Sequence, residues 1–249
     1  MNIWKYHDIT SDYLTFLNPL STAKLDEIIG YLDLPQGARV LDIACGKAEP
    51  LIRIAERYQI RGVGIDISEF FIAAATREAA KRVALPSQVE LLVMDGKDYH
   101  AELASFDLSI CLGATWVYGG LAGTLEYLSS ITRSQGLIMV GEPYWRSQPT
   151  TEYLEAAKMP AEAFGTHAGN IEAALAAGLI PLHSTVSNQD DWDRYEWSRI
   201  RAGERYALQH PEDPDVAELT QRVAGIRDSF IRFGGRDLLG WAVYLSMKP

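Results

Sequence analysis

The sequence predicts an α/β protein built on a doubly wound parallel sheet, and three observations support this prediction. Five short apolar runs alternate with helical stretches between residues 39 and 141, which is the pattern of a parallel sheet. Several of these runs end in small or acidic residues, as strands do when their carboxyl ends border a ligand crevice. A chain of 249 residues that is 47% hydrophobic is long enough to bury one large core.

The predicted elements follow in chain order. Residues 1–20 are mixed and aromatic, and we expect a helical segment that forms either a lid over the site or an additional layer on the core. Ser21 is a suitable N-cap for a helix, because the apolar residues that follow it recur with helical period. The next strands are expected at 39–43, 61–66, 89–94, 106–112 and 137–141, with helices at 51–58, 69–83 and 121–132.

The last hundred residues depart from this alternation. A helix is predicted at 168–177, and two further strands are predicted at 179–186 and 238–247. A helical insertion at about 189–233, rich in aromatic and charged side chains, separates these two strands. We expect a single domain over 1–249 with three parts: an N-terminal helical or lid segment (1–36), a cofactor-binding core (37–145) and a substrate-side half (146–249).

The charge and the cysteine content exclude some classes of function. The net charge of −10 and the pI near 5.0 disfavour a partner held by phosphate contacts, so we expect no nucleic acid. No long apolar stretch follows a basic N-terminal region, so we expect neither a signal peptide nor a membrane partner. Cys45 and Cys111 are too few for a disulfide framework and suit a reducing compartment. We therefore expect a cytoplasmic monomer or homodimer without a metal site.

The chain is organised around residues 38–49, where a strand turns sharply into a helix. The β-prone run from Arg39 to Ile43 ends in small residues just before an apolar helical stretch. Ala44 and Gly46 carry little or no side chain, so a ligand can approach the backbone closely. Three nucleotide-type ligands compete for this crevice.

Two of these ligands fit the side chains poorly. A dinucleotide fingerprint that takes Gly46 as its second glycine places Glu49 at the third, where a carboxylate would repel pyrophosphate. A phosphate-binding P-loop needs a glycine and a hydroxyl residue at the positions that Leu41 and Ala48 occupy.

S-adenosylmethionine (SAM) fits the crevice better than either. SAM has no phosphate but carries a sulfonium, an ammonium and a ribose diol, and carboxylates suit cations and hydroxyl donors. Asp42, Glu49, Asp66 and Asp95 supply carboxylates at expected loop positions. Asp66 follows the first crevice at about the spacing that allows a bond to a pair of ribose hydroxyls.

The motifs of this region resemble those of the class I SAM-dependent methyltransferases. The first family motif is similar to residues 40–46, and the motifs that follow are similar to residues 64–68, 95–96 and 106–113. A narrower bacterial group, the YjhP-type methyltransferases, is similar at residues 113–116, 141–146 and 192–196. The resemblance implies a Rossmann-like, seven-stranded sheet whose last strand is antiparallel. It also implies SAM as cofactor, with S-adenosylhomocysteine (SAH) as product.

The resemblance further implies the cofactor-binding residues. Asp42, Ala44 and Gly46 would face the methionine part of SAM, and Asp66 would bind the ribose hydroxyls. Asp95 and Gly96 would flank the adenine, Leu112 and Gly113 would border the methionine and the transferable methyl, and Cys45 and Ile67 complete the set. Family glycines are replaced by Ala44 and Ala48, and each added methyl narrows the approach to the backbone.

The acceptor side is less defined by the sequence. Glu142 is our first candidate for a base or substrate anchor, and a carboxylate bonded structurally to the turn or to Arg146 is the alternative. Tyr144 is the second candidate for a catalytic side chain. Trp116, Tyr144 and Trp145 could wall a pocket for a flat or cationic substrate, with plain packing as the alternative. Further candidates for substrate binding are Trp192 and His7.

These inferences predict a SAM-dependent methyltransferase that transfers a methyl group to a small-molecule acceptor at O, N, S or C. A base is needed only where the acceptor must lose a proton. The alternative is a SAM-using enzyme that does not methylate, or a SAM-binding regulatory protein. A nucleotide-dependent oxidoreductase is a third hypothesis, against which Glu49 argues.

Overall fold

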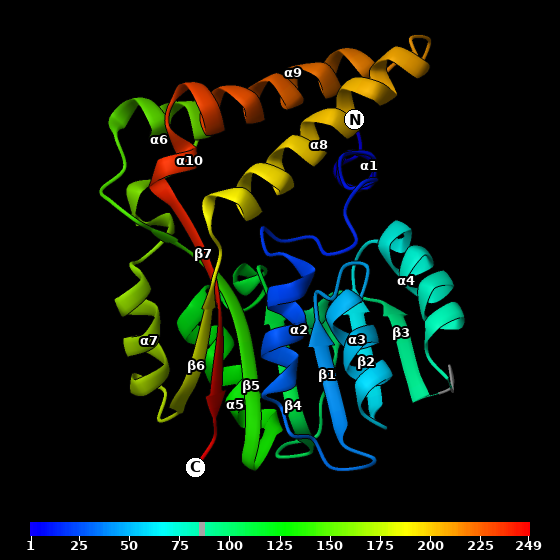
Figure 1. Ribbon diagram of the computed structural model, residues 1–249, viewed down its shortest axis with the longest axis vertical. Helices are drawn as coiled ribbons and strands as arrows, with labels where there is room; N and C mark the ends of the chain where they lie inside the picture. The colour runs from blue at the N-terminus through cyan, green and yellow to red at the C-terminus, as the bar shows by residue number, and fades with distance from the viewer. Residues whose placement is uncertain (85–87) are drawn as a thin grey trace.

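The computed structural model describes residues 1–84 and 88–249 and shows one sheet covered by helices on both faces (Figure 1). Within this part of the chain the sheet has seven strands in the order β3-β2-β1-β4-β5-β7-β6. They are β1 (Arg39–Ile43), β2 (Arg61–Asp66), β3 (Val89–Val93), β4 (Phe106–Leu112), β5 (Thr132–Trp145), β6 (Ile180–Val186) and β7 (Leu239–Met247). Neighbouring strands are parallel from β3 to β5, whereas β7 runs antiparallel to both β5 and β6.

This topology confirms the predicted fold class, including the antiparallel last strand. The bounds of β5 differ most from the prediction, because the strand extends well beyond the expected 137–141. Its second half pairs with β7, where Trp145 lies opposite Leu239. A partner strand that lies about one hundred residues away cannot be inferred from a local apolar run.

The helices alternate with the strands as expected. They are α1 (Ile3–Thr10), α2 (Thr22–Gly30), α3 (Glu49–Arg57), α4 (Glu69–Arg82), α5 (Leu121–Ile131), α6 (Thr151–Ala157), α7 (His167–Ala176), α8 (Gln189–Gln209), α9 (Val216–Arg227) and α10 (Gly235–Leu238). Side-chain caps fix several starts: Ser21 accepts from Lys24 N at the start of α2, and Asn188 forms a capping box with Asp191 at the start of α8.

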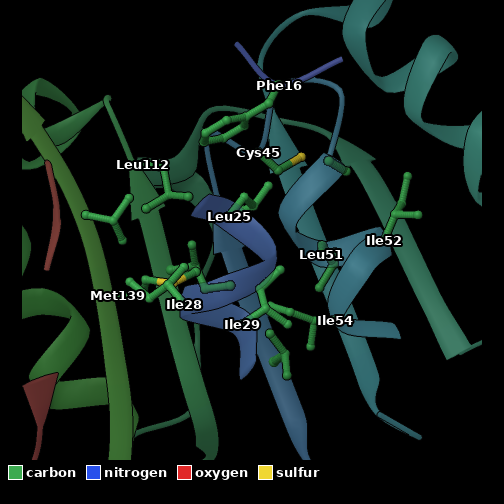
Figure 2. Close-up of a cluster of buried hydrophobic side chains, with 14 of the residues drawn as sticks. Phe16, Leu25, Ile28, Ile29, Cys45, Leu51, Ile52, Ile54, Leu112 and Met139 are labelled. Carbon is green, nitrogen blue, oxygen red and sulfur yellow. The ribbon is translucent and has the colours of Figure 1, made fainter. Parts of the chain in front are cut away.

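Two apolar layers hold the helices on the sheet. On one face, Leu25, Ile28 and Ile29 of α2 pack over the strands (Figure 2), together with side chains of α3 and α4. On the other face, α5 and α7 pack around a second cluster of buried side chains. Consecutive strand residues point to opposite faces, so Val40 belongs to the first layer and Leu41 to the second.

The N-terminal segment and the insertion lie together at the carboxyl ends of the strands (Figure 1). α8 and α9 fill the predicted helical insertion between β6 and β7, and α1 packs against α8. Lys5 Nζ bonds Asp213 Oδ2 at 2.8 Å and Asp215 Oδ2 at 2.7 Å. The N-terminal amino group bonds Glu218 at 2.6 Å. These ion pairs tie the predicted helical N-terminal segment to the insertion.

Among the helices of the described residues, none combines the length and the apolar character needed to cross a membrane.

Candidate active site

A cavity of about 410 Å³, called here the cofactor cavity, opens at the carboxyl ends of β1, β2 and β4. All ten residues that the sequence assigned to the cofactor line it: Asp42, Ala44, Cys45, Gly46, Asp66, Ile67, Asp95, Gly96, Leu112 and Gly113. Residues of the N-terminal segment, from Trp4 to Asn18, form the facing wall. The structure therefore brings together strand ends that are up to seventy residues apart in the chain.

The turn after β1 has an unusual backbone. Ala44, Gly46 and Ala48 have φ values of 55°, 56° and 54°, which lie in the left-handed region that glycine favours. The two alanines adopt this conformation at a cost of about 1–2 kcal/mol each. A Cβ atom on Gly46 would lie 2.8 Å from Leu17 Cδ1, so a larger residue there would force the Leu17 side chain to shift.

Asp66 organises this turn from the end of β2. Its Oδ2 accepts the Gly46 N–H at 2.8 Å and its Oδ1 accepts the Ser68 N–H at 2.8 Å. Burial raises the pKa of the Asp66 carboxyl, and these two hydrogen bonds oppose the shift. The carboxylate is thus held in place at the cavity wall with lone pairs left to accept further donors.

Asp42 lies deeper in the same wall. Its Oδ2 is buried and has no hydrogen-bond partner among the described residues. Burial, with a smaller effect from Asp66, raises the pKa of the Asp42 carboxyl well above its usual value. Among the described residues, neither carboxylate forms an ion pair with a basic side chain. A buried carboxylate that lacks a protein partner suits a ligand that brings its own cation or hydroxyl donors.

Two more glycines, Gly96 and Gly113, shape the cavity wall beyond the ends of β3 and β4. Asp95 Oδ1 accepts the Lys97 N–H at 3.0 Å and so closes a tight turn around Gly96. A Cβ atom on Gly113, whose φ is +76°, would collide with Asn18 Oδ1. Asn18 in turn donates from Nδ2 to the Leu112 carbonyl at 3.2 Å. The N-terminal segment is therefore fitted directly against the end of β4.

A second cavity of about 440 Å³, called here the acceptor cavity, adjoins the first. The two cavities share four lining residues, which are Asn18, Gly113, Tyr195 and Arg199. Its walls combine apolar and polar side chains and come largely from β5, α6, α8, α9, the π-helical turn Asp228–Arg232 and β7. They include Pro143, Tyr153, Phe164, Trp192, Ile226, Phe230 and Trp241. Trp192 therefore lies where a substrate-binding residue was expected.

Two charged residues of the acceptor cavity were missed by the sequence analysis. Glu196 and Arg199 both line it, and Arg199 Nη1 donates to Glu196 Oε2 at 2.9 Å. Burial raises the pKa of the Glu196 carboxyl, although Arg199 opposes the shift. With Trp192 they occupy positions i, i+4 and i+7 of α8, which is one helix face. That spacing was the signal in the sequence that could have identified them.

The two side chains predicted to be catalytic lie away from both cavities of the described residues. Glu142 and Tyr144 belong to β5 and line neither cavity of the described residues. Strand alternation is the reason, since Pro143 faces the acceptor cavity and its two neighbours point to the opposite face. Glu142 instead accepts the Thr115 hydroxyl at 2.8 Å, and Tyr144 packs 5.1 Å from the His167 ring. Burial raises the pKa of Glu142 to about 7.

Three other candidates for substrate binding lie outside the acceptor cavity. Trp145 lines neither cavity but packs behind two wall residues, 5.8 Å from the Tyr153 ring and 5.1 Å from the Phe164 ring. Trp116 lines the cofactor cavity rather than the acceptor cavity and is 71% exposed. His7 also lines the cofactor cavity. Burial, with the nearby arginines, lowers the pKa of His7 to about 4, so it is neutral near pH 7.

Glu49, expected among the ligand-facing carboxylates, is not part of the cofactor cavity. Its two oxygens are engaged by Arg53 Nε and Arg82 Nη1, both at 2.6 Å. The side chain is buried between α3 and α4 and acts as a structural ion-pair partner there.

A Rossmann-like sheet whose carboxyl edge carries this cavity defines a nucleotide-cofactor enzyme, and known proteins specify its class. A family model described as "Methyltransferase domain" matches residues 40–136. A SAM-dependent methyltransferase from Geobacter sulfurreducens, crystallised with SAH, superposes with a TM-score of 0.91 at 29% identity, over 98% of each chain. The "Uncharacterized protein YjhP" of Escherichia coli is 30% identical over 98% of each chain.

The chain therefore belongs to the SAM-dependent methyltransferase family, and its cofactor is SAM. A further relative, the 27-O-demethylrifamycin SV methyltransferase of Amycolatopsis mediterranei, is 26% identical over 98% of this chain and 89% of its own length. The residues present fit the cofactor, because Asp42 and Asp66 are carboxylates without a basic partner in the cavity that a cationic ligand would fill.

Proposed function

We propose that this methyltransferase acts on a small molecule that binds in the acceptor cavity. The observation that carries the proposal is the junction of the two cavities at Asn18, Gly113, Tyr195 and Arg199. A volume of about 440 Å³ lies in the range of small-molecule sites, and walls that combine apolar side chains with a few polar groups are typical of them. The net charge of −10 supports the absence of a nucleic-acid partner.

The same proposal gives roles to the residues of the cofactor cavity. Asp42, with Ala44 and Gly46, holds the methionine part of SAM, and Asp66 accepts the ribose hydroxyls. The remaining roles follow the order of the strands: Asp95 and Gly96 flank the adenine, Cys45 and Ile67 line the site, and Leu112 and Gly113 border the methyl group. The unpartnered Asp42 Oδ2 supports the first of these roles, because the ammonium would neutralise it.

The mechanism that we propose relies on positioning. SAM, when bound, supplies a methyl group on a positively charged sulfur. The chain aligns an acceptor atom with that methyl, which is the larger part of catalysis in such a displacement. The N-terminal segment contributes by closing the cofactor cavity, since Lys47 Nζ bonds the carbonyls of Ser11 and Leu14 at 2.7 and 2.9 Å. This closure excludes water from the junction.

An oxygen acceptor receives support from a relative. The Amycolatopsis enzyme is named as a methyltransferase of 27-O-demethylrifamycin SV. We therefore propose a hydroxyl-bearing acceptor, with N, S and C as the alternatives that product analysis would reveal.

The experiment is a screen of small hydroxylated aromatic compounds with purified protein and SAM. We expect SAH to form together with a product heavier than the acceptor by one CH₂ unit. Ala157→Trp fills the acceptor cavity, whose wall includes Ala157, and should abolish product while SAH binding persists. Ala156→Trp, on the same helix but outside the wall, is the matched control.

Two results would contradict the proposal. Product formation that survives Ala157→Trp would show that the acceptor binds elsewhere. SAM consumption that yields no methylated product would favour the alternative, a SAM-using enzyme that does not methylate.

A further inference from the structure

Glu196 is a buried carboxylate placed beside the junction of the two cavities. Its side chain is only 10% exposed, and the residue lines the acceptor cavity. Tyr195 precedes Glu196 on α8, and Arg199 lies about one helical turn later. Each of these two neighbours lines both the cofactor cavity and the acceptor cavity. Glu196 is thus held within one turn of the place where an acceptor atom meets the cofactor.

The contacts of Glu196 leave it free to act on a ligand. Arg199 Nη1 engages Oε2 at 2.9 Å, and a carboxylate has a second oxygen that can accept a hydrogen bond. The Arg199 contact fixes the orientation of the carboxylate, while the arginine itself packs 5.3 Å above the Tyr195 ring. A buried pair of this kind is costly to maintain and is weak evidence of a purely stabilising role.

Other carboxylates and imidazoles are less suited to accept a proton at this junction. Glu142 lies on the opposite face of the sheet and is bonded to Thr115. His7 lines only the cofactor cavity, and its pKa of about 4 makes it a weak base. Burial raises the pKa of Glu196 instead, which strengthens it as a base.

We propose that Glu196 is the general base of the reaction and takes the proton of a hydroxyl acceptor bound in the acceptor cavity. This inference rests on the proposed function and deepens it by naming the acceptor class, an ionisable hydroxyl such as a phenol or enol. The acceptor O–H bond breaks as its proton passes to the Glu196 carboxylate. The oxygen then forms a bond to the methyl carbon, whose bond to sulfur breaks and leaves its electron pair on the neutral thioether SAH. The Glu196 carboxylic acid afterwards loses the proton to solvent.

The charged and titratable groups around Glu196 come from four elements. Arg199 and Tyr195 lie on the same helix as Glu196. Burial and, to a smaller extent, the charge of Glu196 raise the pKa of Tyr153, which belongs to α6. Burial raises the pKa of Tyr6, which belongs to α1. The charge of Glu196 also raises this pKa, whereas those of Arg199 and of Arg222 on α9 lower it. Arg199 opposes the shift that burial causes in the pKa of Glu196. The tyrosines stay protonated because burial raises their pKa as well.

The test compares two probes of the same shape, 2-naphthol and 2-methylnaphthalene, which differ in the ability to donate a hydrogen bond. Calorimetry measures their affinities for protein saturated with SAH between about pH 5 and about pH 8. Burial raises the pKa of Glu196, so in the native protein we expect the ratio of 2-naphthol affinity to 2-methylnaphthalene affinity to be at least about tenfold higher where the Glu196 carboxyl is ionised than where it is protonated. Glu196→Gln keeps an acceptor for Arg199 but cannot take a proton, and its ratio should stay flat. Glu204→Gln, on the same helix and outside both cavities, should behave as the native protein does.

The outcomes separate this inference from the proposed function. The role of Glu196 would be overturned if both probes bind to the native protein and the ratio of their affinities does not change with pH. The assignment of the acceptor cavity would then still stand. A pH-dependent ratio that persists in Glu196→Gln would assign the proton to another group. Failure of both probes to bind, while SAH binds normally, would overturn the acceptor cavity itself. The first outcome is measured on the native protein alone, so this test does not depend on whether a variant folds.

Discussion

Asp66→Asn tests the cofactor site most directly. Asp66 receives two backbone donors at 2.8 Å, from Gly46 and Ser68, whereas asparagine offers only one carbonyl oxygen. Its amide nitrogen must therefore face one of these donors, and a buried donor without a partner costs about 1–3 kcal/mol. Removing a charge that burial disfavours offsets part of this loss. We expect the free energy of unfolding to fall by about 0–2 kcal/mol.

The effect on cofactor binding should be larger and specific. A carboxylate that accepts ribose hydroxyls contributes about 1–3 kcal/mol through charge-assisted hydrogen bonds, which corresponds to about 5- to 150-fold in affinity. Calorimetric titration of Asp66→Asn with SAH measures this loss, and urea unfolding of the same sample measures stability.

Asp107→Asn is the matched control for this substitution. Asp107 also accepts a backbone donor, from Arg39 N at 2.7 Å, but lies at the opposite end of the sheet, at the start of β4. We expect it to lose stability while SAH affinity stays within about twofold. An Asp66→Asn protein that binds SAH as tightly as the native protein would refute the assignment of Asp66 to the ribose.

Three further predictions follow from particular contacts. The raised pKa of Glu142, about 7, means that the stability this residue contributes is complete below about pH 4.5 and is lost as the pH rises through about 7. Glu142→Gln should therefore raise the free energy of unfolding by about 3 kcal/mol at about pH 8 and change it little at about pH 4.5. Urea titrations at the two pH values measure this, and a difference between variant and native protein that is the same at both would contradict the prediction. Lys5→Met removes an ion pair that holds the N-terminal segment, so SAH should dissociate a few-fold faster in stopped-flow measurements. Lys81→Met removes an exposed ion pair on α4 and should leave this rate unchanged. Gly113→Ala should lower both the melting temperature and SAH affinity, because its Cβ meets Asn18 Oδ1 at a positive φ; a variant unchanged in both would show that this junction is not tightly packed.

The cofactor side could be predicted because its signals are local. Asp42, Gly46, Asp66 and Gly113 each stand at the end of a strand whose apolar run is bounded by small residues. Parallel strands place their carboxyl ends at one edge, so spacing along the chain becomes proximity in space. All ten expected residues consequently line one cavity.

The acceptor side could not be predicted to the same extent, and Glu142 shows why. A carboxylate expected just past a short fifth strand lies instead within a longer strand, because β7 continues the pairing as far as Trp145. Alternation along that strand then turns Glu142 away from the cavity. Glu196, in contrast, stands in a helix whose partners, α1 and α6, come from distant parts of the chain.

The sequence by itself determined the class of fold, the order of the strands' ligand-binding turns and the cofactor. The alternation of strands and helices follows from periodicity and turn residues, which act over a few residues. The antiparallel last strand and the roles of the cofactor-binding residues were implied by the resemblance of the motifs to the methyltransferase family. Only the tertiary structure decided which carboxylate lines the second cavity, since that depends on how α8 and α9 lie over the sheet edge and on which face of β5 each side chain occupies. Such choices are made by packing between segments more than one hundred residues apart, for which no local pattern carries the information.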